Sequence, residues 1–335
     1  MHLPVSIPGP KSGSAPSGPV VERQIAPLLR LTSSSELTYA DIRSYLDANG
    51  AAKYRFDQIY VDMILVGGGG SGAAGWNFSK GIFGGFPGQV VRRRVLLSDL
   101  LSSPSRYIYV MLGIGGEYES DGFQTEMFVW EDGVWDYITW WIALGGRAGV
   151  STSFLTTTSI GLDAQKHRYE EASLLGYKGS DVSIFARYAN EMIETSHFHT
   201  GNLDGPGIGG FVVPFDHAAV TLWPIKYAGG DSSCLSEMKR SGGTPEEQDP
   251  LSKDGQNADP EVFESFGGGG GPGEANLNGQ YSGIGGRGGT PGGGGGAAFF
   301  NGSEEEFSSY LEPLTPGVGG DGGAVFKFSV WESVN

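Results

Sequence analysis

Aromatic side chains form the densest group of residues in this sequence that could make a specific contact. Trp130, Trp135, Tyr137, Trp140 and Trp141 all fall within one short segment. Exposed aromatic rings stack on sugar rings or anchor protein interfaces, whereas clustered tryptophans more often pack in a core. The cluster is therefore a candidate surface for receptor contact, with core packing as the alternative.

Metal binding is the second chemistry to consider. His197 and His199 would share one face of a strand, and His217 and Cys234 follow them in the chain. The segment lacks carboxylates at metal-site spacing and lacks a motif such as H-E-x-x-H. We expect ordinary loop histidines and no metal, with a His-x-His ring around a trimer axis as the minor alternative.

Nucleotide binding is suggested by the glycines of Gly67-x-Gly69-x-x-Gly72, which follow a hydrophobic strand. That fingerprint needs a helix to open at the glycines, and the continuation WNFSKGIFGGFPGQ cannot hold one. The acidic residue expected about 20 positions later is replaced by the basic run 92–94. We expect that run to be a solvated strand or a contact with an acidic neighbouring subunit.

No Ser-His-Asp or Cys-His arrangement has motif support either. A glycosidase needs a pair of carboxylates. No such pair stands out among the scattered aspartates and glutamates, so this alternative is neither supported nor excluded. We therefore expect neither an enzyme nor a bound cofactor.

Composition excludes several further classes. The chain has 335 residues, a net charge of −16 and a pI near 4.7, which argues against nucleic-acid binding through a basic surface. With one cysteine it has no disulfide framework. Its apolar runs are shorter than the roughly 20 residues of a membrane helix, and we read no export signal in residues 1–20. We expect those residues to form an extended tail that either binds along a neighbouring subunit or is disordered.

Glycine is the main compositional signal, with 58 residues in the chain. Glycine loses more conformational entropy than any other residue on ordering and buries no side chain. A tract such as 267–296 is therefore either disordered or packed backbone against backbone as polyproline-II-type helices. We expect the second, with tracts after residue 66, after residue 112 and from residue 267 meeting in one layer.

Strands and one helix should position these tracts. A helix is expected over 36–50, with Thr38 as N-cap and Asp41 returning its hydrogen bond. Strands are expected at 61–66, within 105–116 and within 322–331. Each of these segments combines β-forming residues with an adjacent run of glycines.

The middle of the chain is more mixed. We expect a hairpin over 123–141, a helix over 181–198 from its apolar spacing, and two strands within 210–230. The acidic stretch 231–265 is expected to be a surface excursion or flexible loop.

Together these elements predict a mainly β fold, a sandwich-like glycine-rich domain with ordered glycine loops and a short N-terminal helix. Residues 1–60 would form an attachment segment, and residues 61–335 would form the domain, with a large insertion at about 117–266.

The sequences VDMILVGGGGSGAAG (61–75), SRYIYVMLGIGG (105–116), GGRGGTPGGGGGAA (285–298) and GVGGDGGAVFKFSVW (317–331) share a strand-and-glycine pattern. It resembles the glycine-rich domain of phage minor tail proteins, especially of phages that infect mycobacteria and related actinobacteria. The lead-in LTYADIRSYLDANGAAKYRFDQI (37–59) is similar to theirs, whereas residues 117–266 depart from the family's short glycine-loop spacing.

The resemblance implies a virion protein of the distal tail, made in the host cytoplasm and without catalytic residues. It implies glycine layers that display loops for host recognition, a trimer, and other tail-tip proteins and a host envelope glycan as partners. The alternatives are a tail-tip assembly or capping subunit without receptor contact, a nucleotide-binding or hydrolytic enzyme, and a non-viral glycine-rich adhesin.

Overall fold

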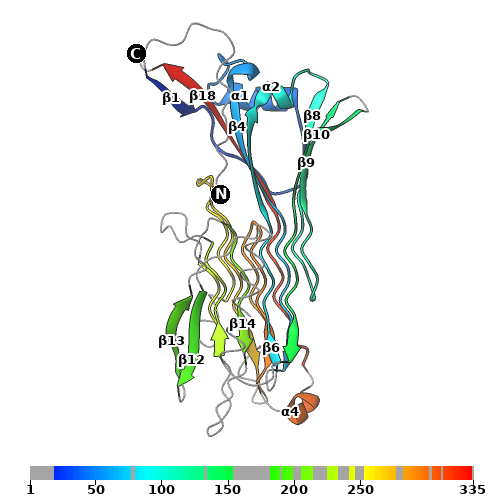
Figure 1. The fold of residues 1–335 in the computed structure, drawn as a ribbon, viewed down its shortest axis with the longest axis vertical. Coiled ribbons are helices and arrows are strands. Elements are labelled where there is room, and N and C mark those ends of the chain that lie inside the picture. Colours follow the sequence, from blue (N-terminus) through cyan, green and yellow to red (C-terminus); the bar gives the residue numbers. More distant parts are fainter. Residues whose placement is uncertain are drawn as a thin grey trace.

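The expected strands and glycine tracts join end to end in the computed structural model, so that each strand continues as a wavy extended segment (Figure 1). The fold is mainly β, as predicted. The structure describes residues 19–76, 80–131, 134–153, 182–188, 191–198, 205–213, 225–232, 241–245, 253–276, 282–301, 304–310 and 312–333.

A β-sandwich with two helices forms one end of the molecule, which we call the head. It comprises β1 (Val20–Gln24), β2 (Leu29–Leu31), β3 (Ser35–Thr38), α1 (Tyr39–Ala48), the 3-10 turn Phe56–Gln58, β4 (Tyr60–Val66), β7 (Val90–Leu96), α2 (Leu97–Leu100), β8 (Arg106–Met111), β9 (Thr125–Glu131), β10 (Val134–Ala143) and β18 (Gly323–Ser333). One sheet has the order β1-β18-β4-β7, with β2 also paired to β18, and the other has the order β10-β9-β8-β3.

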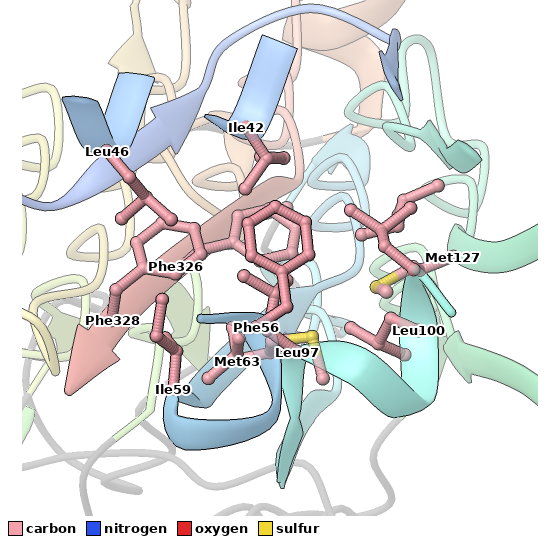
Figure 2. Packing of buried hydrophobic residues seen from close by; sticks show 14 of the residues in the cluster. Ile42, Leu46, Phe56, Ile59, Met63, Leu97, Leu100, Met127, Phe326 and Phe328 are labelled. Atoms are coloured by element: carbon pink, nitrogen blue, oxygen red, sulfur yellow. The ribbon is translucent and has the colours of Figure 1, made fainter. Parts of the chain in front are cut away.

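Large apolar side chains from both sheets fill the head between them (Figure 2). Met63 of β4 and Phe326 of β18 lie in the same buried cluster as Met127 of β9. Removing such a side chain from water is worth about 1.5–3 kcal/mol. The alternation of apolar residues along β4, β8, β9 and β18 thus holds the two sheets together.

Helix α1 closes one end of this core and confirms the expected helix. Thr38 is the N-cap, and its hydroxyl accepts the amide of Asp41 at 3.1 Å while the Asp41 carboxylate accepts the Thr38 amide at 3.0 Å. Ile42 and Leu46 point into the core of the head. Gly50 follows the helix with φ +78°, the left-handed conformation that ends many helices.

Below the head, the glycine tracts run side by side as a bundle of extended segments. Residues 67–73, which continue β4, show the arrangement. Their amides donate in rotation to the segments 83–89, 120–124 and 316–322, and their carbonyls accept from 112–116, 144–150 and 292–298. Gly67 donates to Gln89 and Gly70 to Phe86, so the pattern repeats every three residues. Three residues per turn is the period of a polyproline-II-type helix.

Two other segments, 267–273 and 292–297, are enclosed in the same way. The hydrogen bonds arrange the described segments in three layers. The central layer holds 120–124, 67–73, 292–297, 267–273 and 241–245; the layers on either side hold 144–150, 83–89, 205–210 and 228–232, and 112–116, 316–322, 284–289 and 253–258. The expectation that separate glycine tracts meet and bond through their main chains is therefore confirmed. They do not form one layer, because the tract after residue 112 lies in a flanking layer and the other two lie in the central one.

Glycine is required at most positions of the enclosed segments because a Cβ there would clash with the backbone of a neighbouring segment. A Cβ at Gly69 would lie 2.0 Å from the carbonyl oxygen of Gly293, and one at Gly72 would lie 2.0 Å from that of Gly296. Among the described glycines only Gly50, Gly283 and Gly292 have positive φ. Close backbone approach, and not unusual dihedral angles, thus accounts for the glycine content.

Short strands and a helix close the opposite end of the bundle, which we call the far end. They are β5 (Ala74–Trp76), β6 (Lys80–Ile82), β11 (Ser151–Ser153), β12 (Val182–Tyr188), β13 (Glu191–Phe198), β14 (Phe211–Val213), β15 (Ile225–Tyr227), β16 (Gly273–Ala275), β17 (Ala298–Phe300) and α4 (Glu304–Ser309). A six-stranded sheet has the order β11-β6-β14-β15-β12-β13, and a three-stranded parallel sheet has the order β16-β17-β5.

The helix expected over 181–198 is wrong, because these residues form the antiparallel pair β12 and β13. Val182, Ile184, Phe185 and Tyr188 are residue types that favour strands, and β12 also pairs with β15. Pairing with neighbours therefore outweighs an apolar spacing that by itself suited a helix.

The range 231–265 is also more structured than the expected surface excursion. Its segments 241–245 and 253–258 are members of the bundle, and the amide of Gly243 donates to the carbonyl of Gly269 at 2.7 Å. Farther along, Phe266 packs with Ile64 and Val66 on the outer face of the first head sheet. Residues of the range 117–266 thus belong to the same bundle as the tracts that flank them.

Candidate functional site

The perimeter of the bundle carries the side chains that the interior excludes. Along 144–150, Leu144, Arg147 and Val150 are exposed at intervals of three, while Gly146 and Gly149 face inward. Ile114 and Phe123, on neighbouring segments, are each 60% exposed. One side of such a segment is therefore free to vary and the other two are not, whereas 83–88 and 205–210, in the same layer as 144–150, are buried on all sides.

Carboxylate and amide side chains close this perimeter. An outer segment has backbone amides that no further segment can accept, and a side chain of the adjacent segment accepts them instead. Asp321 Oδ1 accepts the amide of Gly115 at 2.9 Å, and Asp121 Oδ1 accepts that of Ala148 at 2.7 Å. The same role is played by Asp254 toward Arg287, Asn257 toward Thr290, Asp231 toward Gly242 and Gln89 toward Leu144. These side chains take the place of a further hydrogen-bonded segment and so end the bundle at its perimeter. The four aspartates among them also contribute to the negative net charge.

The aromatic residues lie mainly on the outer face of the second head sheet. Tyr107 and Trp130 stack with ring centroids 6.4 Å apart, and Tyr109 and Phe128 lie 5.1 Å apart. Their neighbours along β8 and β9 point into the head core, so these rings point away from it. The face is a ladder of cross-strand aromatic pairs.

The remaining members of the predicted cluster divide between the surface and the core. Trp140 is 44% exposed, and its indole Nε1 donates to Glu126 at 3.0 Å. Trp141 packs against the head core. Trp135 pairs in register with Trp130, and Tyr137 also lies on β10; their side chains are outside the described residues. Candidate contact residues therefore sit on the head and not at the far end.

The structure also locates some of the residues considered for metal binding. His197 lies on β13, and His199, His217 and Cys234 fall outside the described residues. Within the described part of the chain no group of metal-ligating side chains gathers.

After Gly72 the chain continues extended into β5, and the amides of Gly67, Gly69 and Gly72 donate to other segments. These amides are thus committed to the bundle and cannot cradle a phosphate.

The basic run finds acidic partners within the chain itself. Arg92 pairs with Glu264 at 3.1 Å, and Arg94 pairs with Glu22 at 2.8 Å. The expectation of an acidic neighbouring subunit is not needed for these two residues. Arg93 is exposed on the same strand.

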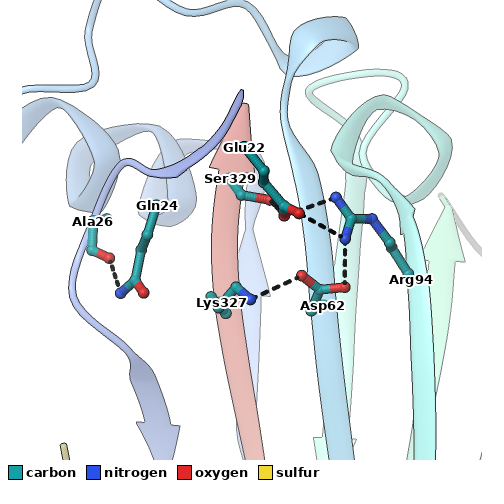
Figure 3. Close-up of polar contacts among 7 residues, drawn as sticks. All are labelled: Glu22, Gln24, Ala26, Asp62, Arg94, Lys327 and Ser329. Atoms are coloured by element: carbon teal, nitrogen blue, oxygen red, sulfur yellow. Dashed lines mark hydrogen bonds and ion pairs between the residues drawn. The ribbon is translucent and has the colours of Figure 1, made fainter. Parts of the chain in front are cut away.

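Around Arg94, a polar network fastens strand β1 to the other strands of the first head sheet (Figure 3). Glu22 of β1 accepts from Arg94 of β7 and from Ser329 of β18, while Asp62 of β4 lies 3.5 Å from both Arg94 and Lys327. Partial burial raises the pKa of the Glu22 carboxyl, but the hydrogen bonds from Arg94 and Ser329 outweigh it and lower the pKa overall. Residues 19–60 are therefore an integral part of the head.

The features that decide the family are the enclosed glycine segments and the strands that continue from them. The profile of the glycine-rich domain family matches residues 47–329. The chain belongs to the glycine-rich domain family. This glycine-rich domain includes the range 117–266 that sequence spacing set apart. No curated protein matches the chain in sequence.

Sequence reasoning missed the perimeter of this glycine-rich domain. The capping aspartates looked like scattered surface acids, although Asp121, Asp231 and Asp321 each stand beside glycine or one residue from it. An acidic or amide residue at an outward position of a three-residue repeat is the signal that could have found them. In the part of the chain that the structure describes, no helix is long and apolar enough to cross a bilayer.

Proposed function

We propose that this protein is a structural component of a phage tail tip that contributes to recognition of the host-cell surface. In this proposal the head attaches to other tail-tip proteins, and the bundle holds the far end away from them. The supporting observation is the enclosed hydrogen-bonded bundle, which spaces the far end from the head.

The integration of the N-terminal segment supports this direction of attachment. β1, β2 and β3 all pair with head strands, so residues that precede the glycine tracts enter at the head. The far end carries chain reversals between bundle segments, and such loops are where binding residues usually gather.

The aromatic ladder favours a second role for the head. Its location beside the attachment segment suits a contact with a tail neighbour, which is the assembly or capping alternative. A host envelope glycan remains the proposed partner for the far end, and a trimer the proposed assembly, which sedimentation of the purified chain tests.

Electron cryomicroscopy of virions of the phage that encodes this chain tests the proposal. We expect the bundle to be found at the distal tail with the head toward the particle. Purified chain should also bind host envelopes, and Trp140→Ala should leave that binding unchanged while weakening assembly. Absence of the chain from the virion would refute the proposal, and a reversed orientation would refute the assigned roles of the two ends.

A further inference from the structure

Three side chains that could react with one another meet at the far end of the molecule. Lys226 lies on β15, Glu274 on β16, and Asn301 directly after β17. Lys226 and Glu274 are each only 1% exposed and form an ion pair through Glu274 Oε2. The other oxygen, Oε1, accepts from the Asn301 side-chain amide at 2.8 Å. One carboxylate therefore holds an amine and a carboxamide at the same time.

Apolar side chains lie beside the amine. Lys226 Nζ lies 5.3 Å from the centroid of the Phe299 ring, and Lys226 is paired in register with Val212. Phe299 and Val212 belong to a buried cluster with Ile82. Burying two opposite charges in such surroundings is costly, and transfer of one proton from the ammonium to the carboxylate removes both charges. The product is a neutral amine, which is a nucleophile, beside a neutral carboxylic acid.

We propose that these residues form an intramolecular isopeptide bond between Lys226 Nζ and Asn301 Cγ, with Glu274 as the catalytic proton carrier. The Lys226 ammonium first gives a proton to Glu274. After rotation of the Asn301 amide, the protonated Glu274 donates to Oδ1 and polarises the carbonyl, and the Lys226 lone pair attacks Cγ. The Nζ–Cγ bond forms and the Cγ–Nδ2 bond breaks. Nζ loses two protons in all: one converts the departing amino group to ammonia, and the other, carried by Glu274, leaves with the ammonia as ammonium, so that Glu274 ends as a carboxylate. No oxidant or other reactant is consumed.

The backbone holds the reacting groups in place before any reaction. Glu274 and Phe299 are register partners in the parallel pair β16 and β17. The backbone amide of Asn301 donates to the Ala275 carbonyl at 2.8 Å. Amides are poor electrophiles in solution, but a fixed, water-poor arrangement replaces a bimolecular encounter by an intramolecular one. The geometry therefore supplies the condition that this reaction lacks in water.

Such a bond would join the two far-end sheets covalently. β15 belongs to the six-stranded sheet and β17 to the three-stranded sheet, and the two strands are distant in sequence. The inference does not rest on the proposed function, since it concerns only chemistry inside the folded chain.

Mass spectrometry of the intact, purified full chain tests the proposal. We expect a mass below that of the sequence by one ammonia, about 17 Da, the group that the attacking amine displaces. Trypsin should release one cross-linked species made of 188–239 and 288–327, because the linked lysine resists cleavage. Lys226→Arg and Asn301→Ser should restore the full mass of each variant. Lys253→Arg, the same change at the bundle perimeter, should keep the deficit.

Two results would overturn the proposal. One is a folded chain, shown by a cooperative melt, that has the full sequence mass. The other is a deficit that maps to any peptide pair other than 188–239 and 288–327. The wild-type measurement decides the existence of the bond even if a variant fails to fold. Glu274→Gln that folds yet still loses ammonia would overturn only the role given to the carboxylate.

Discussion

The head and the bundle are parts of one chain that are stabilised by opposite means. In the head, side chains such as Phe326 and Met63 interlock between two sheets, and the strands of each sheet hydrogen-bond only to strands of that sheet. In the bundle, the enclosed segments are almost entirely glycine, with few buried side chains such as that of Ser71, and the backbone bonds in several directions at once. A protein can thus form an ordered interior from peptide groups alone, provided that nothing larger than hydrogen projects inward.

The two regions should also differ in the heat capacity of unfolding. Exposure of apolar side chains raises the heat capacity, and exposure of peptide groups lowers it. Unfolding of the head therefore carries most of the positive change, and the bundle adds little for its length. Single substitutions in each region can test this division of roles, and the stability that they remove should differ in size.

A methyl group added inside the bundle should have the largest effect. In Gly295→Ala the new Cβ would lie 2.0 Å from the Gly317 carbonyl oxygen, and the surrounding segments leave no room to shift. We expect a loss of more than about 4 kcal/mol, or no folding, because overpacking against backbone cannot relax. Denaturant unfolding measures it. Gly50→Ala is the comparison variant, since its Cβ would have no atom within 4 Å and only its positive φ should cost about 1–2 kcal/mol. Equal losses for both would contradict the role of backbone contact.

Removal of a core ring should be the largest effect in the head. Phe326→Ala deletes a buried side chain between the sheets, and we expect a loss of about 3–5 kcal/mol. Trp331→Ala, on the same strand but 45% exposed, should change stability by less than about 1 kcal/mol. Hydrogen exchange should then show head amides losing protection before those of 267–273. Simultaneous loss in both regions would show that they unfold as one unit.

Removal of a perimeter cap should have an intermediate effect. Asp321→Ala leaves the Gly115 amide without its acceptor, which we expect to cost about 1–2 kcal/mol. Asp321→Asn keeps an oxygen in that place and should recover most of the loss. Thermal unfolding compares the two variants. Equal destabilisation by alanine and asparagine would mean that charge, and not the hydrogen bond, is what matters.

Acid should weaken the polar network of the head, with the smallest effect. The pKa of Glu22 is lowered in the folded chain, so its contribution is present above the ordinary glutamate value of 4.5 and is lost as pH falls through the lower, folded value. We expect up to about 1 kcal/mol, because the pair is partly exposed. Glu22→Gln should remove that part of the pH dependence of stability. An unchanged pH profile in this variant would exclude Glu22 as its source.

Much of the fold is predictable from local signals in the sequence. The capping box at Thr38 and Asp41, the alternation along β4, β8 and β18, and the long glycine runs each predict the structure that forms. The pair β12 and β13 was not predicted, because its residues also satisfy a helical spacing, and pairing between strands, including that with β15, decides in favour of the strand. Segments 241–245 and 253–258 were missed because they carry few glycines and join the bundle at its edge.

The candidate site was less accessible to sequence reasoning. Clustering of Trp130, Trp140 and Trp141 was visible, but whether each ring faces the core or the surface depends on strand register. The meeting of Lys226, Glu274 and Asn301 could not be foreseen, because three strands far apart in sequence bring them together. That Lys226 and Glu274 are buried among apolar side chains becomes visible only in the folded structure.

The three-residue turn of the bundle segments also sets a rule for changes in chain length. Inserting one residue into a segment such as 144–150 would rotate the rest of that segment by a third of a turn and drive Arg147 or Val150 into a space sized for hydrogen. Gain or loss of three residues restores the phase, and the bundle lengthens or shortens only if all of its segments change by the same number. The length of such a bundle can therefore change only in steps of three residues per segment.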